Sequence, residues 1–183
     1  MILVFGVAGS GKSTQSELLA ELEGWHWVSM GQLFRNNIQG DLREAMNQGK
    51  LMEDSIAEQL LDTELQKLEN KKMIVLDGFP RRIAQAEWLM QSIGSRGDSI
   101  QAVIHISANQ EVVRKRLLQR GRTDDKPDAI TERFYEYEQV IKPLLDLFRQ
   151  KAIPVIEVNG EQTPAEVQRD IRNSLQDNGV ITS

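Results

Sequence analysis

One glycine-rich loop near the amino terminus restricts the fold of this chain more than any other feature. Residues 6–13 read GVAGSGKS and match the pattern G-x-x-x-x-G-K-[S/T]. A strand-like apolar run, residues 1–5, precedes the loop, and residues 12–22 follow it with helical periodicity. In this setting the glycines let the backbone turn tightly and bring its N–H groups against phosphate oxygens, while the helix adds its positive end. The sequence therefore predicts a phosphate-binding loop between a strand and a helix.

The rest of the chain alternates between short apolar runs and longer amphipathic segments. Runs rich in β-forming residues predict five strands, at residues 1–5, 25–29, 73–77, 102–107 and 153–158. Helical periodicity predicts helices at residues 12–22, 30–38, 54–68, 83–93, 110–119, 130–150 and 164–176. Apolar strands joined by helices form parallel sheets, with ligands at the carboxyl ends of the strands. We therefore expect an α/β fold of the P-loop NTPase type, in which helices flank a parallel sheet of five strands.

The composition narrows the possible classes of protein. With 183 residues and 40% hydrophobic content, the chain can build one sizeable core, so a single domain over residues 1–183 is expected. The 22 basic and 27 acidic residues give a net charge of -5, which argues against a general nucleic-acid or membrane-surface binder. The lack of cysteine excludes disulfides and cysteine zinc sites. Apolar runs are too short to span a bilayer and no signal-peptide pattern opens the sequence, so we expect a cytoplasmic location.

The glycine-rich loop predicts a nucleoside triphosphate as ligand. Lys12 would reach the β- and γ-phosphates, and Ser13 would place a hydroxyl on Mg²⁺. The residues predicted to bind ATP in this loop are Gly9, Ser10, Gly11, Lys12, Ser13 and Thr14. The alternative, a glycine-rich turn without a ligand, does not explain why glycines, lysine and hydroxyl occur in order between a strand and a helix.

Four further segments occur in a fixed order after the loop. They read VSMGQLFR (28–35), QGKLMED (48–54), LDGFPRRIAQ (76–85) and RGRTDD (120–125), the last followed by Arg133. Together with the loop they resemble the adenylate kinase family of nucleoside monophosphate kinases over about residues 1–167. The resemblance implies an acceptor-binding insertion at about 29–52 and a short lid at about 121–127. It also implies transfer of the γ-phosphoryl group of ATP to a nucleoside monophosphate, AMP being favoured, with Mg²⁺ as cofactor. A monomer is expected, although the resemblance does not fix the oligomeric state.

The chemistry of this transfer agrees with the resemblance. The attacking phosphate oxygen is already ionised near neutral pH, so the reaction needs alignment and charge neutralisation, not a general base. Planar guanidinium groups suit phosphate oxygens. The resemblance implies that Arg35 and Arg81 contact the acceptor phosphate and that Arg122 and Arg133 close over the phosphates. The predicted catalytic residues are thus Lys12, Arg81, Arg122 and Arg133.

The resemblance also assigns residues on the donor side. It implies that Arg120 contacts the donor and that Arg116 packs against the donor base, although an ordinary exposed helix charge is the alternative for Arg116. Asp77 ends a predicted strand and resembles the acid that, with Ser13, holds Mg²⁺ through phosphates and water; the alternative is a cap of the next helix. A cis peptide is implied before Pro80.

The acceptor base is the part of the site that the sequence leaves most open. Gln85 stands at the family position that hydrogen-bonds the base, and its amide offers a donor and an acceptor suited to an adenine edge. By resemblance, the residues of the acceptor site are Met30, Arg35, Lys50, Leu51, Met52, Gly78, Phe79, Pro80, Arg81, Gln85, Arg122 and Arg133.

Two departures from the family pattern leave the choice of monophosphate open, but not phosphoryl transfer. Met30 replaces the usual threonine and Gln32 the usual aspartate, so Met30 would either pack against adenine without a hydrogen bond or admit another base. The first alternative is therefore a pyrimidine monophosphate kinase for UMP or CMP. The second alternative comes from the fold and not from these departures: a nucleotide-sensing module that binds without turnover, against which the complete set of arginines argues.

Overall fold

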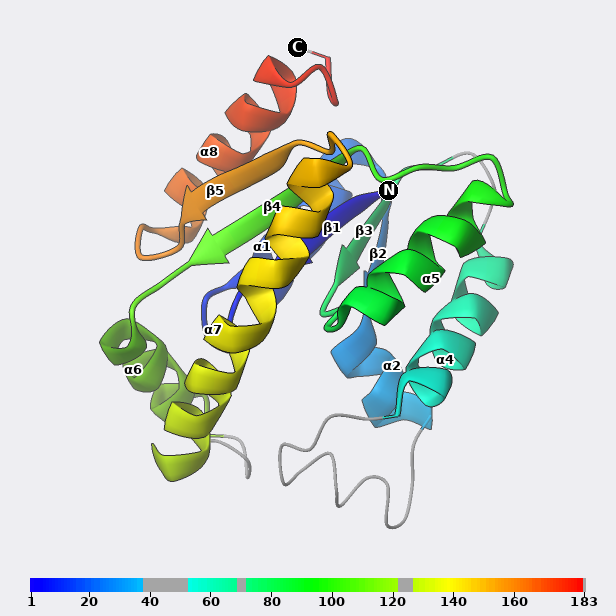
Figure 1. Cartoon of the computed structure of the whole chain (residues 1–183). Helices are drawn as coiled ribbons and strands as arrows, with labels where there is room; N and C mark the ends of the chain where they lie inside the picture. Colours follow the sequence, from blue (N-terminus) through cyan, green and yellow to red (C-terminus); the bar gives the residue numbers. More distant parts are fainter. Residues whose placement is uncertain (38–52, 69–71, 122–126, 183) are drawn as a thin grey trace.

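Five parallel strands form a single sheet at the centre of the described part of the chain (Figure 1). The computed structural model describes residues 1–37, 53–68, 72–121 and 127–182. The strands are β1 (Ile2–Phe5), β2 (His26–Ser29), β3 (Ile74–Asp77), β4 (Ala102–Ser107) and β5 (Val155–Asn159). They lie in the order β2-β3-β1-β4-β5, and each neighbouring pair is parallel. The prediction of a parallel five-stranded sheet is confirmed.

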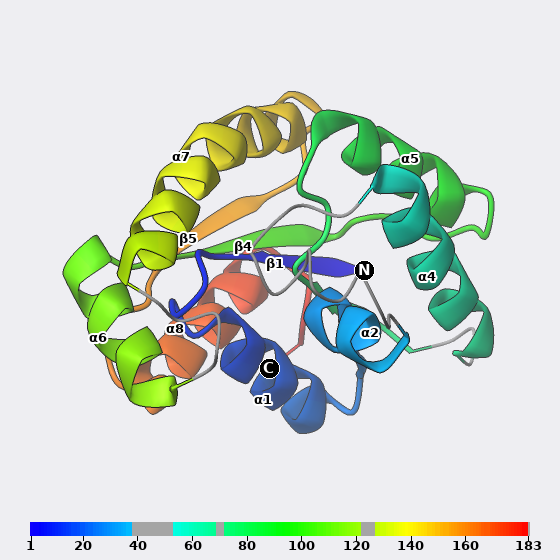
Figure 2. The same cartoon turned by 90° about the horizontal axis from the view of Figure 1, so that it is seen from below.

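Helices flank both faces of this sheet. The described helices are α1 (Lys12–Glu23), α2 (Met30–Asn37), α4 (Asp54–Lys67), α5 (Ile83–Gly94), α6 (Gln110–Arg120), α7 (Pro127–Gln150) and α8 (Pro164–Asp177). Figures 1 and 2 show α5 and α7 on one face of the sheet and α1 and α8 on the other. Each predicted helix is present. α7 begins at Pro127 instead of Ile130, because proline is favoured in the first turn of a helix although it adds nothing to an apolar period.

The apolar residues of β1 alternate between two cores. Leu3 and Phe5 belong to the core under α2, α4, α5 and α7, whereas Ile2 and Val4 belong to the core under α1 and α8. All of these side chains are buried. A strand covered on both faces must be apolar at every position, which is why this run shows no polar alternation.

The arrangement of the strands brings several loops together at one edge. All strands are parallel, so the loops that follow β1, β3 and β5 leave the same edge of the sheet. Figure 2 views the molecule from this end, with α6 and α2 on opposite sides. In the described ranges, no helix is long and apolar enough to cross a membrane.

The predicted insertion and lid fall mainly on other parts of the chain. Residues 38–52 of the insertion and 122–126 of the lid lie outside the described residues. Their boundaries, about 29–52 and about 121–127, therefore stay predictions.

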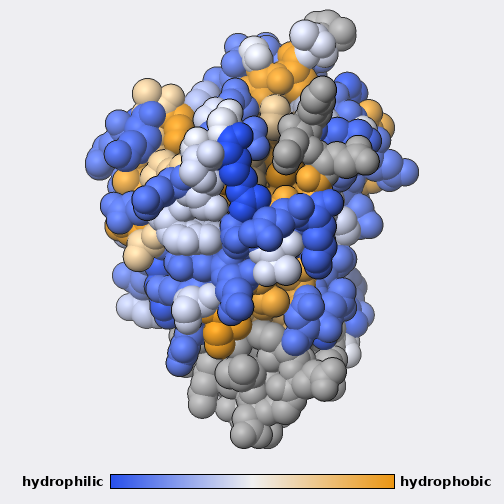
Figure 3. Space-filling model, turned by 90° about the vertical axis from the view of Figure 1, so that its right-hand side faces the viewer, coloured by the Kyte–Doolittle hydropathy of each residue, from blue (hydrophilic) through white to orange (hydrophobic). Residues whose placement is uncertain are grey.

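The side of the molecule that carries α4 and α5 is predominantly hydrophilic, with small separate hydrophobic areas (Figure 3).

Candidate active site

A cleft of about 880 Å³ opens at the carboxyl edge of the sheet. Its volume lies in the range of small-molecule sites, and it is lined by the glycine-rich loop, the segment after β3, and parts of α2, α6 and α7. It brings together most of the residues that the sequence predicts for the site. These are Gly9, Ser10, Gly11, Lys12, Ser13, Thr14, Arg35, Asp77, Gly78, Phe79, Pro80, Arg81, Gln85, Arg116 and Arg120.

The glycine-rich loop requires glycine at two positions for different reasons. A Cβ on Gly6 would lie 2.3 Å from Ser10 Oγ and 2.9 Å from the carbonyl oxygen of Ile106, so the close approach of these atoms leaves no room for a side chain. Gly11 precedes α1 with φ at 101°, in the left-handed region that glycine adopts readily. No side chain among the described residues caps α1 there. The positive end of α1 therefore opens on the cleft, where an anion would satisfy its first N–H groups.

Asp77 links the loop to the ends of two strands. The Ser13 hydroxyl donates to Asp77 Oδ2 at 2.5 Å, and the Ser29 hydroxyl, at the end of β2, donates to the same oxygen at 3.4 Å. Asp77 is only 2% exposed, and its Oδ1 atom has no hydrogen-bond partner among the described residues. An unpartnered buried carboxylate oxygen is costly. Ser13 and Asp77 supply the hydroxyl and carboxylate oxygens that Mg²⁺ prefers, so these residues fit the expected ion.

The alternative role predicted for Asp77 does not agree with the next helix. Arg82 precedes α5, and no described side chain makes a capping hydrogen bond there. Asp77 is therefore not the cap of α5, and its carboxylate faces the loop instead.

Two arginines lie on the side of the cleft formed by α2 and the segment after β3. Arg81 Nε donates to the carbonyl oxygen of Gly78 at 3.3 Å. The guanidinium of Arg35 folds over its own helix, because a Cβ on Gly31 would lie 3.2 Å from Arg35 Nη1. The peptide bond before Pro80 is cis, as the resemblance implies. Both arginines are exposed at the cleft. Arg82 lines the same side and pairs with Asp54, so guanidinium groups gather on this side of the cleft.

Gln85 lies on the same side, but its amide already makes contacts within the protein. Its Oε1 accepts from the backbone N–H of Arg81 at 2.7 Å, and its Nε2 donates to Asp54 Oδ1 at 2.7 Å. Only 4% of Gln85 is exposed. Its predicted contact with the acceptor base would use the remaining hydrogen and lone pair of the amide.

Arg116 joins the glycine-rich loop to the loop after β5. Its Nη1 donates to the carbonyl oxygen of Gly160 at 2.8 Å and to that of Ser10 at 3.3 Å. These contacts exclude the alternative of an ordinary exposed charge, because one guanidinium holds two loops at the edge of the cleft. Arg120, one turn later on α6, is exposed and also lines the cleft.

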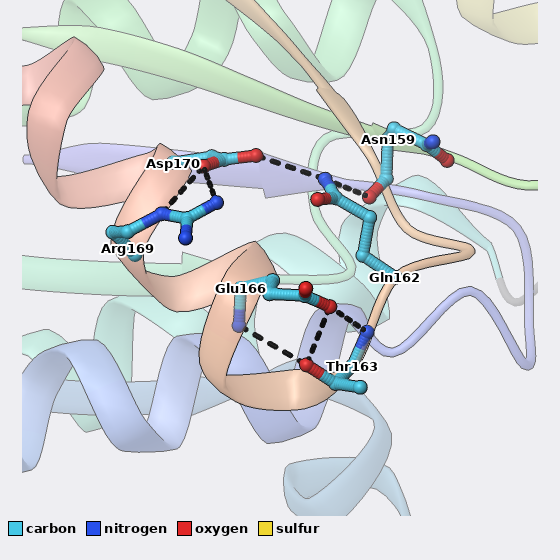
Figure 4. Close-up of polar contacts among 6 residues, drawn as sticks. All are labelled: Asn159, Gln162, Thr163, Glu166, Arg169 and Asp170. Atoms are coloured by element: carbon cyan, nitrogen blue, oxygen red, sulfur yellow. Dashed lines mark hydrogen bonds and ion pairs between the residues drawn. The ribbon is translucent and has the colours of Figure 1, made fainter.

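The loop after β5 is held by its own network of hydrogen bonds (Figure 4). Gln162 Nε2 donates to Asp170 Oδ2 at 2.8 Å and to the carbonyl oxygen of Asn159 at 3.2 Å. Thr163 and Glu166 form a capping box at the start of α8. The hydrogen bond from Gln162 lowers the pKa of Asp170, and those from Thr163 lower the pKa of Glu166. The α6 side of the cleft thus rests on a loop held by hydrogen bonds.

Some predicted site residues cannot be placed in the cleft. Lys50, Leu51, Met52 and Arg122 lie outside the described residues. Arg133 belongs to α7, within the described backbone, but its side chain is not described. The roles implied for these residues stay predictions.

Several cleft residues are not among the site residues predicted from the sequence. Ser29, Gly160 and Gln162 line the cleft, as does Tyr137 of α7. Burial, and then the charges of Glu157 and Glu138, raise the pKa of Tyr137, so its hydroxyl is neutral at physiological pH. Ser29 ends β2 and Gly160 follows β5, and both positions point to the site because the carboxyl ends of parallel strands form the ligand edge. Tyr137 has no such signal.

Met30 is placed differently from the other residues predicted for the acceptor site. Its side chain is 0% exposed and belongs to the core with Phe34 of the same helix, while Gly31 and Arg35 line the cleft. A contact between Met30 and the acceptor base stays a prediction, whereas its packing role is visible.

This burial makes a prediction about stability. Met30→Thr should lower the free energy of unfolding by about 2–4 kcal/mol, because it leaves a cavity and buries a hydroxyl. Gln32→Thr, at an exposed position of the same helix, should change it by less than about 0.5 kcal/mol. Urea unfolding followed by circular dichroism measures both. Equal stability of Met30→Thr and the parent would contradict the packing role.

The cleft extends to both sides of one phosphate loop, and each side carries the guanidinium groups that phosphates require. This arrangement is that of a P-loop enzyme of the nucleoside monophosphate kinase class. A sequence model of the family described as Adenylate kinase matches residues 4–153. The chain belongs to this family.

Relatives with this name resemble the chain over most of its length. The chain is 37% identical over 180 residues to a protein of Prochlorococcus marinus named "Adenylate kinase". The alignment covers 95% of this chain and 96% of the relative. It is 34% identical over 156 residues to an adenylate kinase of Mycobacterium tuberculosis, covering 82% and 86%. It is 32% identical over 179 residues to one of Flavobacterium psychrophilum, covering 92% and 94%. The family predicted from the motifs is thereby confirmed.

Proposed function

We propose that this protein transfers the γ-phosphoryl group of ATP to AMP and so forms two molecules of ADP. The observation that carries the proposal is the position of the phosphate loop between two sets of cationic side chains. Arg116 and Arg120 lie on the side of α6, and Arg35 and Arg81 lie on the side of α2 and β3. A donor on one side and an acceptor on the other would meet above Lys12.

Each group has a role that follows from its position. The N–H groups of the glycine-rich loop and of α1 hold the phosphates of the donor, and Lys12 stabilises the charge that develops on the migrating group. Arg35 and Arg81 neutralise and align the acceptor phosphate. No protein base is needed, because the acceptor oxygen is already ionised. Catalysis therefore consists of alignment and charge stabilisation in a site from which water is excluded.

Ser13 and Asp77 are the residues that would hold magnesium. The Ser13 hydroxyl and Asp77 Oδ1, to which no described residue donates, offer oxygen contacts to the ion or to its water molecules. Bound magnesium supplies positive charge beside the β- and γ-phosphates. The hydrogen bond from the Ser13 hydroxyl to Asp77 Oδ2 keeps these two groups together.

The relatives named adenylate kinase support AMP as acceptor, and Gln85 on the acceptor side has an amide that suits adenine. The test is a coupled assay that compares kcat/KM for AMP, CMP, UMP and GMP at saturating ATP. We expect AMP to be preferred. A preference for CMP or UMP would establish the pyrimidine alternative, and binding of ATP and AMP without single-turnover formation of ADP would establish the sensing module. A monomeric state and a cytoplasmic location remain predictions.

A further inference from the structure

A chain of hydrogen bonds fixes Gln85 from both ends of its amide. Asp54, in the first turn of α4, accepts from Gln85 Nε2 at 2.7 Å, and Gln85 Oε1 accepts from the backbone N–H of Arg81 at 2.7 Å. Arg82 Nη1 donates to the same Asp54 oxygen at 2.7 Å. The amide thus lies between one carboxylate and one backbone N–H at the wall of the cleft.

The chemistry of these partners allows only one orientation of the amide. An ionised carboxylate accepts hydrogen bonds and cannot donate, whereas a backbone N–H donates and cannot accept. Nε2 must therefore face Asp54, and Oε1 must face Arg81. A flipped amide would place Oε1 against the Asp54 carboxylate and the NH₂ group against the N–H of Arg81. It would lose both bonds and set like groups against each other at the buried Gln85 amide, beside the partly exposed Asp54.

Within the described residues, these two contacts leave the amide one hydrogen on Nε2 and one lone pair on Oε1 for a ligand. This edge matches a base that presents an amino group beside a ring nitrogen acceptor, as adenine does with its 6-amino group and N1. Hypoxanthine, the base of IMP, presents the reverse: a 6-oxo group beside an N1–H donor. Only a flipped amide would pair with it.

We infer that Asp54 is a positioning residue that holds Gln85 in the orientation selecting 6-amino over 6-oxo purine monophosphates. The inference rests on the proposed function, in which Gln85 faces the acceptor base. Asp54 acts through Gln85 and rejects the wrong base by making the flipped amide unfavourable.

A matched pair of variants separates the effect of the hydrogen-bond acceptor of Asp54 from the effect of its side-chain volume. Asp54→Leu removes the acceptor and should lower the ratio of kcat/KM for AMP to that for IMP by about tenfold, the effect of one charge-assisted hydrogen bond. Asp54→Asn keeps an oxygen, and Arg82, which only donates, holds that oxygen toward the amide. It should retain most of the AMP/IMP ratio. Arg82→Ala, with the carboxylate intact, should also retain it.

The double variant Asp54→Asn with Arg82→Ala tests the orientation itself. Without Arg82 the side-chain amide of the asparagine is free to rotate. It can then hydrogen-bond to the Gln85 amide in either orientation of Gln85, so the ratio of kcat/KM for AMP to that for IMP should fall toward that of Asp54→Leu. Thermal melts of each variant report folding, and Asp54→Ala replaces Asp54→Leu if the latter does not fold. General loosening of the site would lower kcat/KM for both nucleotides and leave their ratio unchanged.

The outcomes distinguish this inference from the proposed function. If the parent protein prefers AMP and both Asp54→Leu and Asp54→Ala keep the parental AMP/IMP ratio, the role of Asp54 is overturned while the kinase function stands. If the ratio falls equally in Asp54→Asn and Asp54→Leu, the retained oxygen has no orienting effect and the inference also fails. If the parent uses IMP as well as AMP, the assignment of AMP as the favoured acceptor fails first.

Discussion

Replacing Lys12 with methionine should abolish most of the turnover and leave the fold intact. The side chain lines the cleft directly after the glycine-rich loop, where the transferred group must pass. Methionine keeps much of the length but none of the charge. Losing one preorganised stabiliser of transition-state charge lowers kcat by about a hundredfold to a thousandfold. Since Lys12 acts mainly on the transition state, ATP affinity should change much less than kcat.

The measurements are kcat from a coupled assay and ATP affinity from calorimetric titration. Lys142→Met, at an exposed position on α7, is the matched control and should keep parental activity. A circular dichroism melt establishes that both variants are folded. Near-parental turnover of Lys12→Met would show that the glycine-rich loop does not hold the migrating phosphoryl group.

The fold was accessible from sequence because its inner strands, such as β1 and β3, are covered on both faces, although β5 at the edge alternates between buried and exposed residues. A run such as residues 1–5 has no polar position, and such runs separated by helical periods leave few arrangements other than a parallel sheet with helices on both sides. The helix ends were less well predicted. The start of α7 at Pro127 shows why, since a helix terminus depends on capping geometry more than on apolar spacing.

The parts of the site that lie in one continuous segment were also predictable. The backbone conformation of residues 6–13 and 77–81 depends on the local sequence, because their glycines and the proline restrict which backbone angles the chain adopts. The burial of Met30 in the core could also be predicted from the sequence. This residue stands four positions before Phe34, and this spacing puts both on one apolar face of α2, which packs in the core.

Contacts between distant segments could not be predicted in this way. Asp54 meets Gln85 across 31 positions, and Arg116 meets Gly160 across 44. In neither pair does the local sequence around one residue predict which residue it contacts. Such contacts follow from the order of the strands, which brings the ends of β3 and β5 to the same edge, and become visible only once the chain is folded.

Arg81→Ala should impair the use of AMP and spare the binding of ATP. Arg81 is exposed at the cleft, beside Gly78 and on the side of α2, away from Arg116 and the loop after β5. If it contacts the acceptor phosphate, its removal deletes charge-assisted hydrogen bonds worth about 1.5–3 kcal/mol, or roughly ten- to 150-fold in kcat/KM for AMP. The backbone N–H of Arg81 still donates to Gln85 in this variant, so base selection should persist.

The neighbouring arginine provides the control for this variant. Arg82 pairs with Asp54, and both side chains are partly exposed, so Arg82→Ala should change kcat/KM for AMP by only a few-fold at most, because exposed ion pairs contribute about 0–1 kcal/mol. Initial rates with varied AMP at saturating ATP give kcat/KM, and direct titration gives the ATP dissociation constant. A loss confined to AMP places Arg81 on the acceptor phosphate. If ATP affinity falls as much as AMP use does, Arg81 serves the donor as well, and the division of the cleft into an α6 side and an α2 side is wrong.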